Sequence, residues 1–91
     1  MTLGEYARAT VERVMKQLAD PSMVNEFLRQ TAANLAWKGI PRADQQWFWR
    51  EITDQLSARR ELADTGAGAD NLMHAHNQAA YWLHVTQDEE S

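Results

Sequence analysis

The sequence predicts an all-α fold, a compact four-helix assembly packed either as a bundle or orthogonally. Apolar residues recur with helical spacing along four segments. No segment shows the alternation of β-branched residues that is typical of strands. Proline and glycine separate the segments, and we expect one helical domain at 1–87 with an acidic, disordered tail at 88–91. The predicted helices span about 3–19, 21–38, 43–63 and 70–86.

The first predicted helix begins after Thr2, a candidate N-cap that is followed three residues later by Glu5, as in a capping box. It ends near Asp20, which can cap the second helix, and Pro21 suits the first turn of that helix. The apolar stripe of the first helix consists of Leu3, Ala7, Val11, Val14 and Leu18, with Met15 at its edge. That of the second consists of Val24, Phe27, Leu28, Thr31 and Leu35.

The third predicted helix follows a turn in which Gly39 is a candidate C-terminal cap, and it begins after Pro41 with Asp44 as a candidate N-cap. Its apolar stripe consists of Phe48, Trp49, Ile52, Leu56 and Ala63. The stretch 63–69 has two glycines and no large apolar residue, which predicts a flexible linker. The last stripe consists of Leu72, Ala75, His76, Ala79 and Leu83, with Trp82 at one margin.

Size and charge limit the classes of function. The chain has 91 residues, no cysteine and a formal net charge of -4, most of it near the C-terminus. Without cysteine there is no disulfide or zinc-thiolate site, and we expect a cytoplasmic protein. The N-terminus lacks the pattern of a signal peptide, and no run of apolar residues is long enough to cross a membrane, so no membrane association is expected.

Two tryptophans lie outside the predicted apolar stripes. Consecutive rings at Trp47, Phe48 and Trp49 span about 200° of a helix, so they cannot all face one core. Trp47 lies about 150° from the centre of its stripe, and Trp37, just before the turn, lies about 130° from the preceding one. They could pack on each other or under a terminal segment as a second small core, or they could be exposed for a partner.

The leading hypothesis is a non-enzymatic module that docks on a larger protein as a regulator or inhibitor. In this hypothesis Trp37 and Trp47 insert as aromatic anchors, while Arg42, Arg50 and Asp54 form a charged rim that sets orientation. A phage or mobile-element protein that blocks host machinery would suit this size and charge. These five residues are the predicted partner-binding site, and a protein partner is favoured over nucleic acid.

Two alternatives stay open. The helix, glycine turn and helix around Gly39 invite comparison with helix-turn-helix DNA readers, and Arg42, Arg50 and Arg60 could lie along phosphates. The match is loose, because Pro41 stands where a capping serine or threonine is common and two tryptophans occupy the helix that would enter the groove. The other alternative is a homodimer whose interface buries the tryptophans outside the stripes.

Neither a metal site, a cofactor site nor a catalytic centre is predicted. His74, His76 and His84 share the last predicted helix, but their spacings do not bring any two of them to one ion. His76 is instead expected to be buried and hydrogen-bonded, with the other two at the surface. Serines lack a neighbouring base, and the carboxylates of the third helix are expected to be solvated charge partners.

Overall fold

A computed structural model describes residues 2–62 and 67–88 and confirms the all-α fold, with four helices and no strand in those ranges. The helices are α1 (Leu3–Lys16), α2 (Pro21–Trp37), α3 (Arg42–Leu62) and α4 (Ala67–Asp88). None of these helices is both long enough and apolar enough to span a bilayer, within the described residues.

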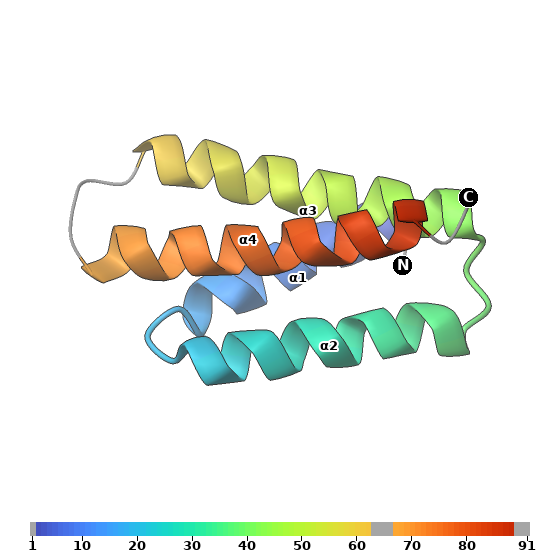
Figure 1. Cartoon of the computed structure of the whole chain (residues 1–91), viewed down its shortest axis with the longest axis horizontal. Coiled ribbons are helices and arrows are strands. Elements are labelled where there is room, and N and C mark those ends of the chain that lie inside the picture. The colour runs from blue at the N-terminus through green and yellow to red at the C-terminus, as the bar shows by residue number, and fades with distance from the viewer. Residues whose placement is uncertain (1, 63–66, 89–91) are drawn as a thin grey trace.

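The helices form an up-down bundle, which is the first of the two predicted packings. In Figure 1, α1 and α3 run in one direction along the long axis, and α2 and α4 run in the other. Close packing joins α3 to α4, α1 to α3, and α2 to α4. Helices α1 and α2 follow each other in the chain but touch only weakly. Around the bundle the order is therefore α1, α3, α4, α2, and the bundle is least closed between α1 and α2.

The core is built from the predicted stripes, with few exceptions. Its centre is aromatic: the fully buried Trp49 indole lies edge-on to Phe48 and stacks on the partly buried Trp82 of α4, with ring centroids 5.2 and 6.1 Å apart. Aliphatic side chains from every helix surround these rings: Val11, Val14, Val24, Leu28, Leu35, Ile52, Leu56 and Leu72. Phe27 is an exception, because it is only half-buried and packs at the edge of this cluster.

The connection between α1 and α2 is longer than predicted. Helix α1 ends at Lys16 and not near residue 19, because the Gln17 amide donates to the carbonyls of both Arg13 and Val14 and closes the last turn. Asp20 then adopts an extended backbone, as a residue before proline must, and its carboxylate accepts from the amides of Ser22 and Met23. The caps predicted at Thr2 and Asp20 are both confirmed.

Helices α3 and α4 begin earlier than predicted. Helix α3 starts directly after Pro41, whose carbonyl accepts from Gln45, so Asp44 lies inside the first turn and is not the cap. Helix α4 starts at Ala67, within the predicted linker, where two alanines flanking Gly68 favour helix. The helix continues to Asp88, two residues beyond the predicted end at 86. It therefore includes residue 88, the first residue of the predicted tail. The rest of the linker (63–66) and of the tail (89–91) lies outside the described residues.

Candidate functional site

The turn between α2 and α3 has the hydrogen bonds of a Schellman motif. The Ile40 amide donates to the Leu35 carbonyl, and the Gly39 amide donates to the carbonyl of Ala36, both at 3.1 Å. Gly39 supplies the left-handed backbone that this motif requires, with φ +71°. The Gln45 side chain donates to the Ile40 carbonyl at 2.8 Å, which ties the turn to α3. The last residue of α2 is thereby fixed in place, and that residue is Trp37.

Trp37 is the most exposed large apolar side chain in the described part of the protein, at 88%. Trp47 is 43% exposed, and its ring lies beside Gly4 at the start of α1. Neither indole makes a ring contact with the other or with another aromatic residue of the described ranges. The two tryptophans therefore do not pack on each other, which was one of the two arrangements considered from the sequence. Trp47 is partly covered by the N-terminal segment, and Trp37 is left to solvent.

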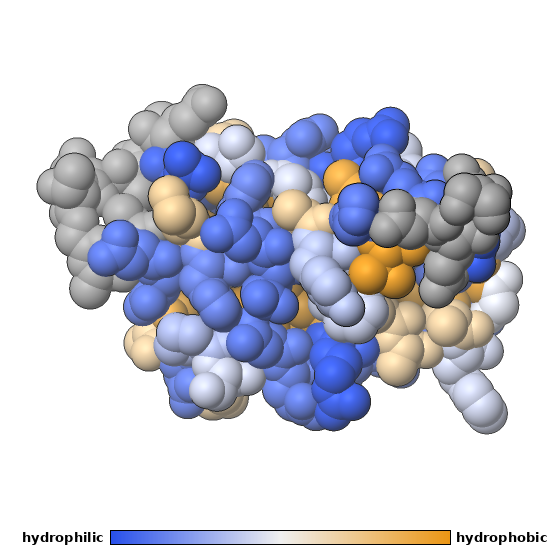
Figure 2. Space-filling model, viewed as in Figure 1, coloured by the Kyte–Doolittle hydropathy of each residue, from blue (hydrophilic) through white to orange (hydrophobic). Residues whose placement is uncertain are grey.

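Both tryptophans lie at the end of the bundle where α2 passes into α3, since each is within a few residues of the turn. Figure 2 shows that the face over α3 and α4 is mainly hydrophilic, and that hydrophobic colour gathers toward this same end. Apolar surface of this kind, edged by polar side chains, is typical of interaction sites.

The three charged residues of the predicted rim are all exposed on α3. Helical geometry places Arg50 and Asp54 within about 60° of Trp47, so these three share one face. Arg42 lies about 140° from Trp47 on the same helix and forms other interactions within the protein. The predicted site thus divides into a face on α3 and the end of α2.

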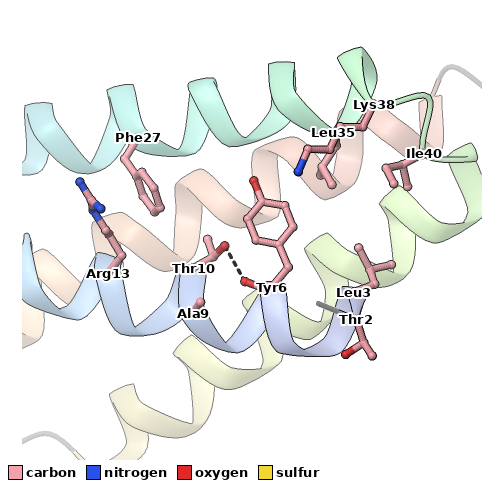
Figure 3. A pocket seen from close by; sticks show the side chains of 10 residues that line it. All are labelled: Thr2, Leu3, Tyr6, Ala9, Thr10, Arg13, Phe27, Leu35, Lys38 and Ile40. Carbon is pink, nitrogen blue, oxygen red and sulfur yellow. Dashed lines mark hydrogen bonds between the residues drawn. The ribbon is translucent and has the colours of Figure 1, made fainter.

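Sequence reasoning missed an open groove between α1 and α2 with a volume of about 450 Å³. Figure 3 shows the Tyr6 ring rising from α1 and the Phe27 ring descending from α2 into this space. Leu3, Leu35 and Ile40 close the end nearest the α2–α3 turn. A smaller hollow of about 190 Å³ continues past Arg13 and Phe27 toward Gln17 and Met23. The two hollows together follow most of the length of α1.

Each end of the larger hollow carries a cation held against a ring. Arg13 of α1 lies over the Phe27 ring of α2, and Lys38 at the end of α2 lies over the Tyr6 ring of α1, each 5.5 Å from the ring centroid. These contacts orient the two cations toward the groove and join α1 to α2 across it. No carboxylate lines the larger hollow. Neither cation has a carboxylate within ion-pair distance in the described ranges.

Other polar groups are used within the fold. Arg29 and Glu26 form an exposed ion pair on α2 with a closest N to O distance of 2.6 Å. Hydrogen bonds from Arg29 and then from Gln30 lower the pKa of Glu26. His74 lies 2.8 Å from the Asn25 side chain and links α4 to α2, whereas His76 is only half-buried, which differs from the sequence expectation.

Metal-ligating side chains are scattered: no group of three or more that could hold a metal ion forms in the part of the chain that the structure describes. The groove carries no pair of acid and base side chains at hydrogen-bond distance, and its lining is mainly apolar. Its chemistry suits binding and offers no assembled set of reacting groups.

A signal for the groove is present in the sequence but is weak. Tyr6 lies about 100° from Ala7 and outside the main stripe of α1, and Lys38 and Phe27 fall within about 20° of each other on α2. These positions place aromatic rings beside the buried stripes. Only the three-dimensional arrangement shows that these rings stay partly exposed, although the Tyr6 ring also lies 5.1 Å from the Phe48 ring of α3.

The fold and this surface define a small all-α four-helix protein with a cation-edged apolar groove and an exposed tryptophan at one end. Comparisons of the chain with known protein families, with curated proteins and with solved structures find no match.

Proposed function

We propose that this protein is a non-enzymatic interaction module that docks on a larger protein and acts as a regulator or inhibitor. The observation that carries the proposal is the 88% exposure of Trp37. An indole this exposed gains little packing energy for the fold, whereas tryptophan is among the residues that contribute most binding energy at protein interfaces. The Schellman turn holds the backbone beneath it, so little backbone entropy is lost on binding.

Trp47, Arg50 and Asp54 extend the proposed docking surface along α3. Trp47 is 43% exposed beside Gly4 of α1 and therefore offers less free surface than Trp37. Arg50 and Asp54 are exposed beside it and can set the orientation of a partner by charge. In this proposal Arg42, at the start of α3, lies at the boundary of the surface. A phage or mobile-element inhibitor of a host protein remains a proposal that rests on size and charge alone.

The DNA-binding alternative has less support from the fold. The two helices of a helix-turn-helix motif cross at about 90–120°, whereas α2 and α3 run antiparallel at separate corners of the bundle (Figure 1). The cations that would contact phosphates, Arg42, Arg50 and Arg60, are few, and the net charge of -4 opposes binding to phosphates. The exposure of Trp37 also fits the homodimer alternative, because a second copy of the protein could cover this side chain.

The test is affinity capture from a lysate of the native host with three immobilised proteins: the wild type, Trp37→Ala and Tyr81→Ala. Tyr81 is the matched control, because it is another exposed aromatic residue, 55% exposed on α4. A protein partner should be retained by the wild type and by the Tyr81 variant and lost by Trp37→Ala. The dissociation constant of this partner for Trp37→Ala should exceed that for the wild type by about 30-fold or more, as expected for a hot spot of roughly 2 kcal/mol.

Retention of the same partner by Trp37→Ala would contradict the proposal. Light scattering on the purified wild type separates the homodimer, because that alternative requires a mass of twice 10.4 kDa and its conversion to monomer by Trp37→Asp. A shift of labelled DNA at low salt that Trp37→Ala leaves unchanged would favour the DNA-binding alternative.

A further inference from the structure

We infer that the groove between α1 and α2 binds an acidic amphipathic helix of about four turns, supplied by a partner protein. The inference deepens the proposed function, on which it rests for the class of partner, and it assigns a site that is separate from the surface on α3. Three properties of the groove carry it: its apolar lining, its length and its charge.

The apolar lining comes from the sides of α1 and α2 that face each other. Helix α1 packs on α3 and helix α2 packs on α4, whereas α1 and α2 contact each other only weakly. The facing sides of α1 and α2 therefore border an open groove. Tyr6 and Phe27 point into this gap and stay half-exposed. An amphipathic helix that lays its apolar face into such a groove would cover both rings, which is a common mode of peptide recognition.

The length of the groove is given by its lining on the α1 side. The residues that line the two hollows there run from Thr2, the cap of α1, to Gln17 at its end. Fifteen residues of helix rise about 22 Å, so a ligand helix of about 14 residues would fill both hollows. Met23 and Gln30 line the smaller hollow from α2, and Met23 is 51% exposed.

The facing edge of α1 lets a ligand backbone come close. Ala9 lines the groove and is exposed at its rim, between the turns that carry Tyr6 and Arg13. A methyl group at this position leaves room for a helix to lie against α1, as small residues do at close helix contacts.

The charge of the groove selects an acidic ligand. Arg13 and Lys38 are the charged side chains that line the larger hollow, in a chain whose net charge is -4. The smaller hollow adds Glu26, whose charge is paired with Arg29. The ring beneath Lys38, Tyr6, lies seven residues from Arg13 along α1, which is roughly 10 Å. A ligand helix with two carboxylates seven residues apart would place one near each cation. A single-chain fatty acid could satisfy only one of them.

The test uses the full chain and a synthetic 16-residue helical peptide. Leucine and phenylalanine occupy one face of the peptide, and two glutamates lie seven residues apart at its margin. A second peptide has lysine in place of each glutamate. Titration calorimetry gives the affinities, and amide chemical shifts of the isotope-labelled protein locate the site. The acidic peptide should bind at least about tenfold more tightly than the basic one, with shifts confined to α1, α2 and the turn after α2.

Two substitutions form a matched pair of controls. Ala9→Glu places a bulky negative charge at the rim of the groove and should weaken binding of the acidic peptide at least about tenfold. Ala58→Glu makes the same change at an exposed position of α3, a helix that does not line the groove, and it should keep the affinity within about twofold. Both alanines are exposed, so neither change disturbs the core. The double variant Arg13→Glu with Lys38→Glu should reverse the preference between the two peptides.

Several results would overturn the inference. Equal affinity for the two peptides, or shifts that map to α3 or α4, would show that the groove does not select an acidic helix. Groove shifts produced by decanoate but not by the acidic peptide would assign the site to a lipid chain. Groove shifts that grow with protein concentration alone would assign it to a second copy. A lysate partner that still depends on Trp37, with no peptide bound in the groove, would leave the proposed function standing and reject this inference alone.

Discussion

Replacing Trp37 by alanine should change the stability of the fold by no more than about 0.5 kcal/mol. A tryptophan can bury up to about 250 Å², and the 88% exposure leaves about an eighth of that area, roughly 30 Å², covered in the fold. At about 25 cal/mol per Å² the loss is roughly 0.75 kcal/mol. Alanine is the better helix former by up to about 0.5 kcal/mol, which offsets most of this loss.

The assay is urea unfolding followed by circular dichroism, with Trp49→Ala as the contrasting variant. Trp49 is fully buried between Phe48 and Trp82, and its truncation should remove about 3–5 kcal/mol. That is a large part of the roughly 5–14 kcal/mol expected for 91 residues. The difference in fluorescence between the wild type and Trp37→Ala should have the red-shifted emission of a hydrated indole. A loss above about 1.5 kcal/mol in Trp37→Ala would refute the reasoning, because it would mean that Trp37 is covered in solution.

Three further outcomes follow from the structure. Gly39→Ala should lower the stability by about 1–2 kcal/mol, because its φ of +71° is unfavourable for a side chain even where space is open; Gly39→Asn, measured in the same melts, should lose less. Gly4→Ala should raise the melting temperature by about 2–4 °C, since the added methyl would lie in ordinary contact 3.7 Å from Trp47 and would favour the first turn of α1; a lower melting temperature would contradict this. The pKa of Glu26 is lowered in the fold, so its contribution to stability is present above the ordinary pKa of a glutamate and is lost as pH falls through the lowered value; Arg29→Gln should move that pKa upward in an NMR titration.

Helical periodicity predicted the direction of most side chains but not what covers them. Val11, Leu28 and Ile52 fall on predicted stripes and are fully buried. Phe27 falls on the same kind of stripe and is only half-buried, because its side of α2 faces the open gap beside α1. A periodic pattern gives an angle about one helix axis, whereas burial depends on whether a second helix occupies that direction. The groove was missed for this reason.

Helical angles also account for how much of the surface around Trp37 and Trp47 could be predicted. The angle of Trp37 placed it outside the core, and its high exposure agrees with that angle. Trp47 has a comparable angle, yet the start of α1 reaches its ring through Gly4, a contact between residues 43 positions apart that no local pattern encodes. The caps at Thr2 and Asp20 were predictable because a cap is satisfied within three residues.

The weak contact between α1 and α2 also bears on how the bundle opens. Helices α3 and α4 share the most extensive interface, whereas α1 attaches to α3 and α2 attaches to α4. Each of the first two helices is thus held by its own neighbour, so either can detach while the other stays docked, and amides of α1 and α2 should exchange with solvent before those of α3. Anything bound between α1 and α2 would add to the two cation–π contacts that join them and would couple their opening more strongly. Occupation of the groove should then be visible as slower amide exchange of both helices at once, including at residues that the ligand does not touch.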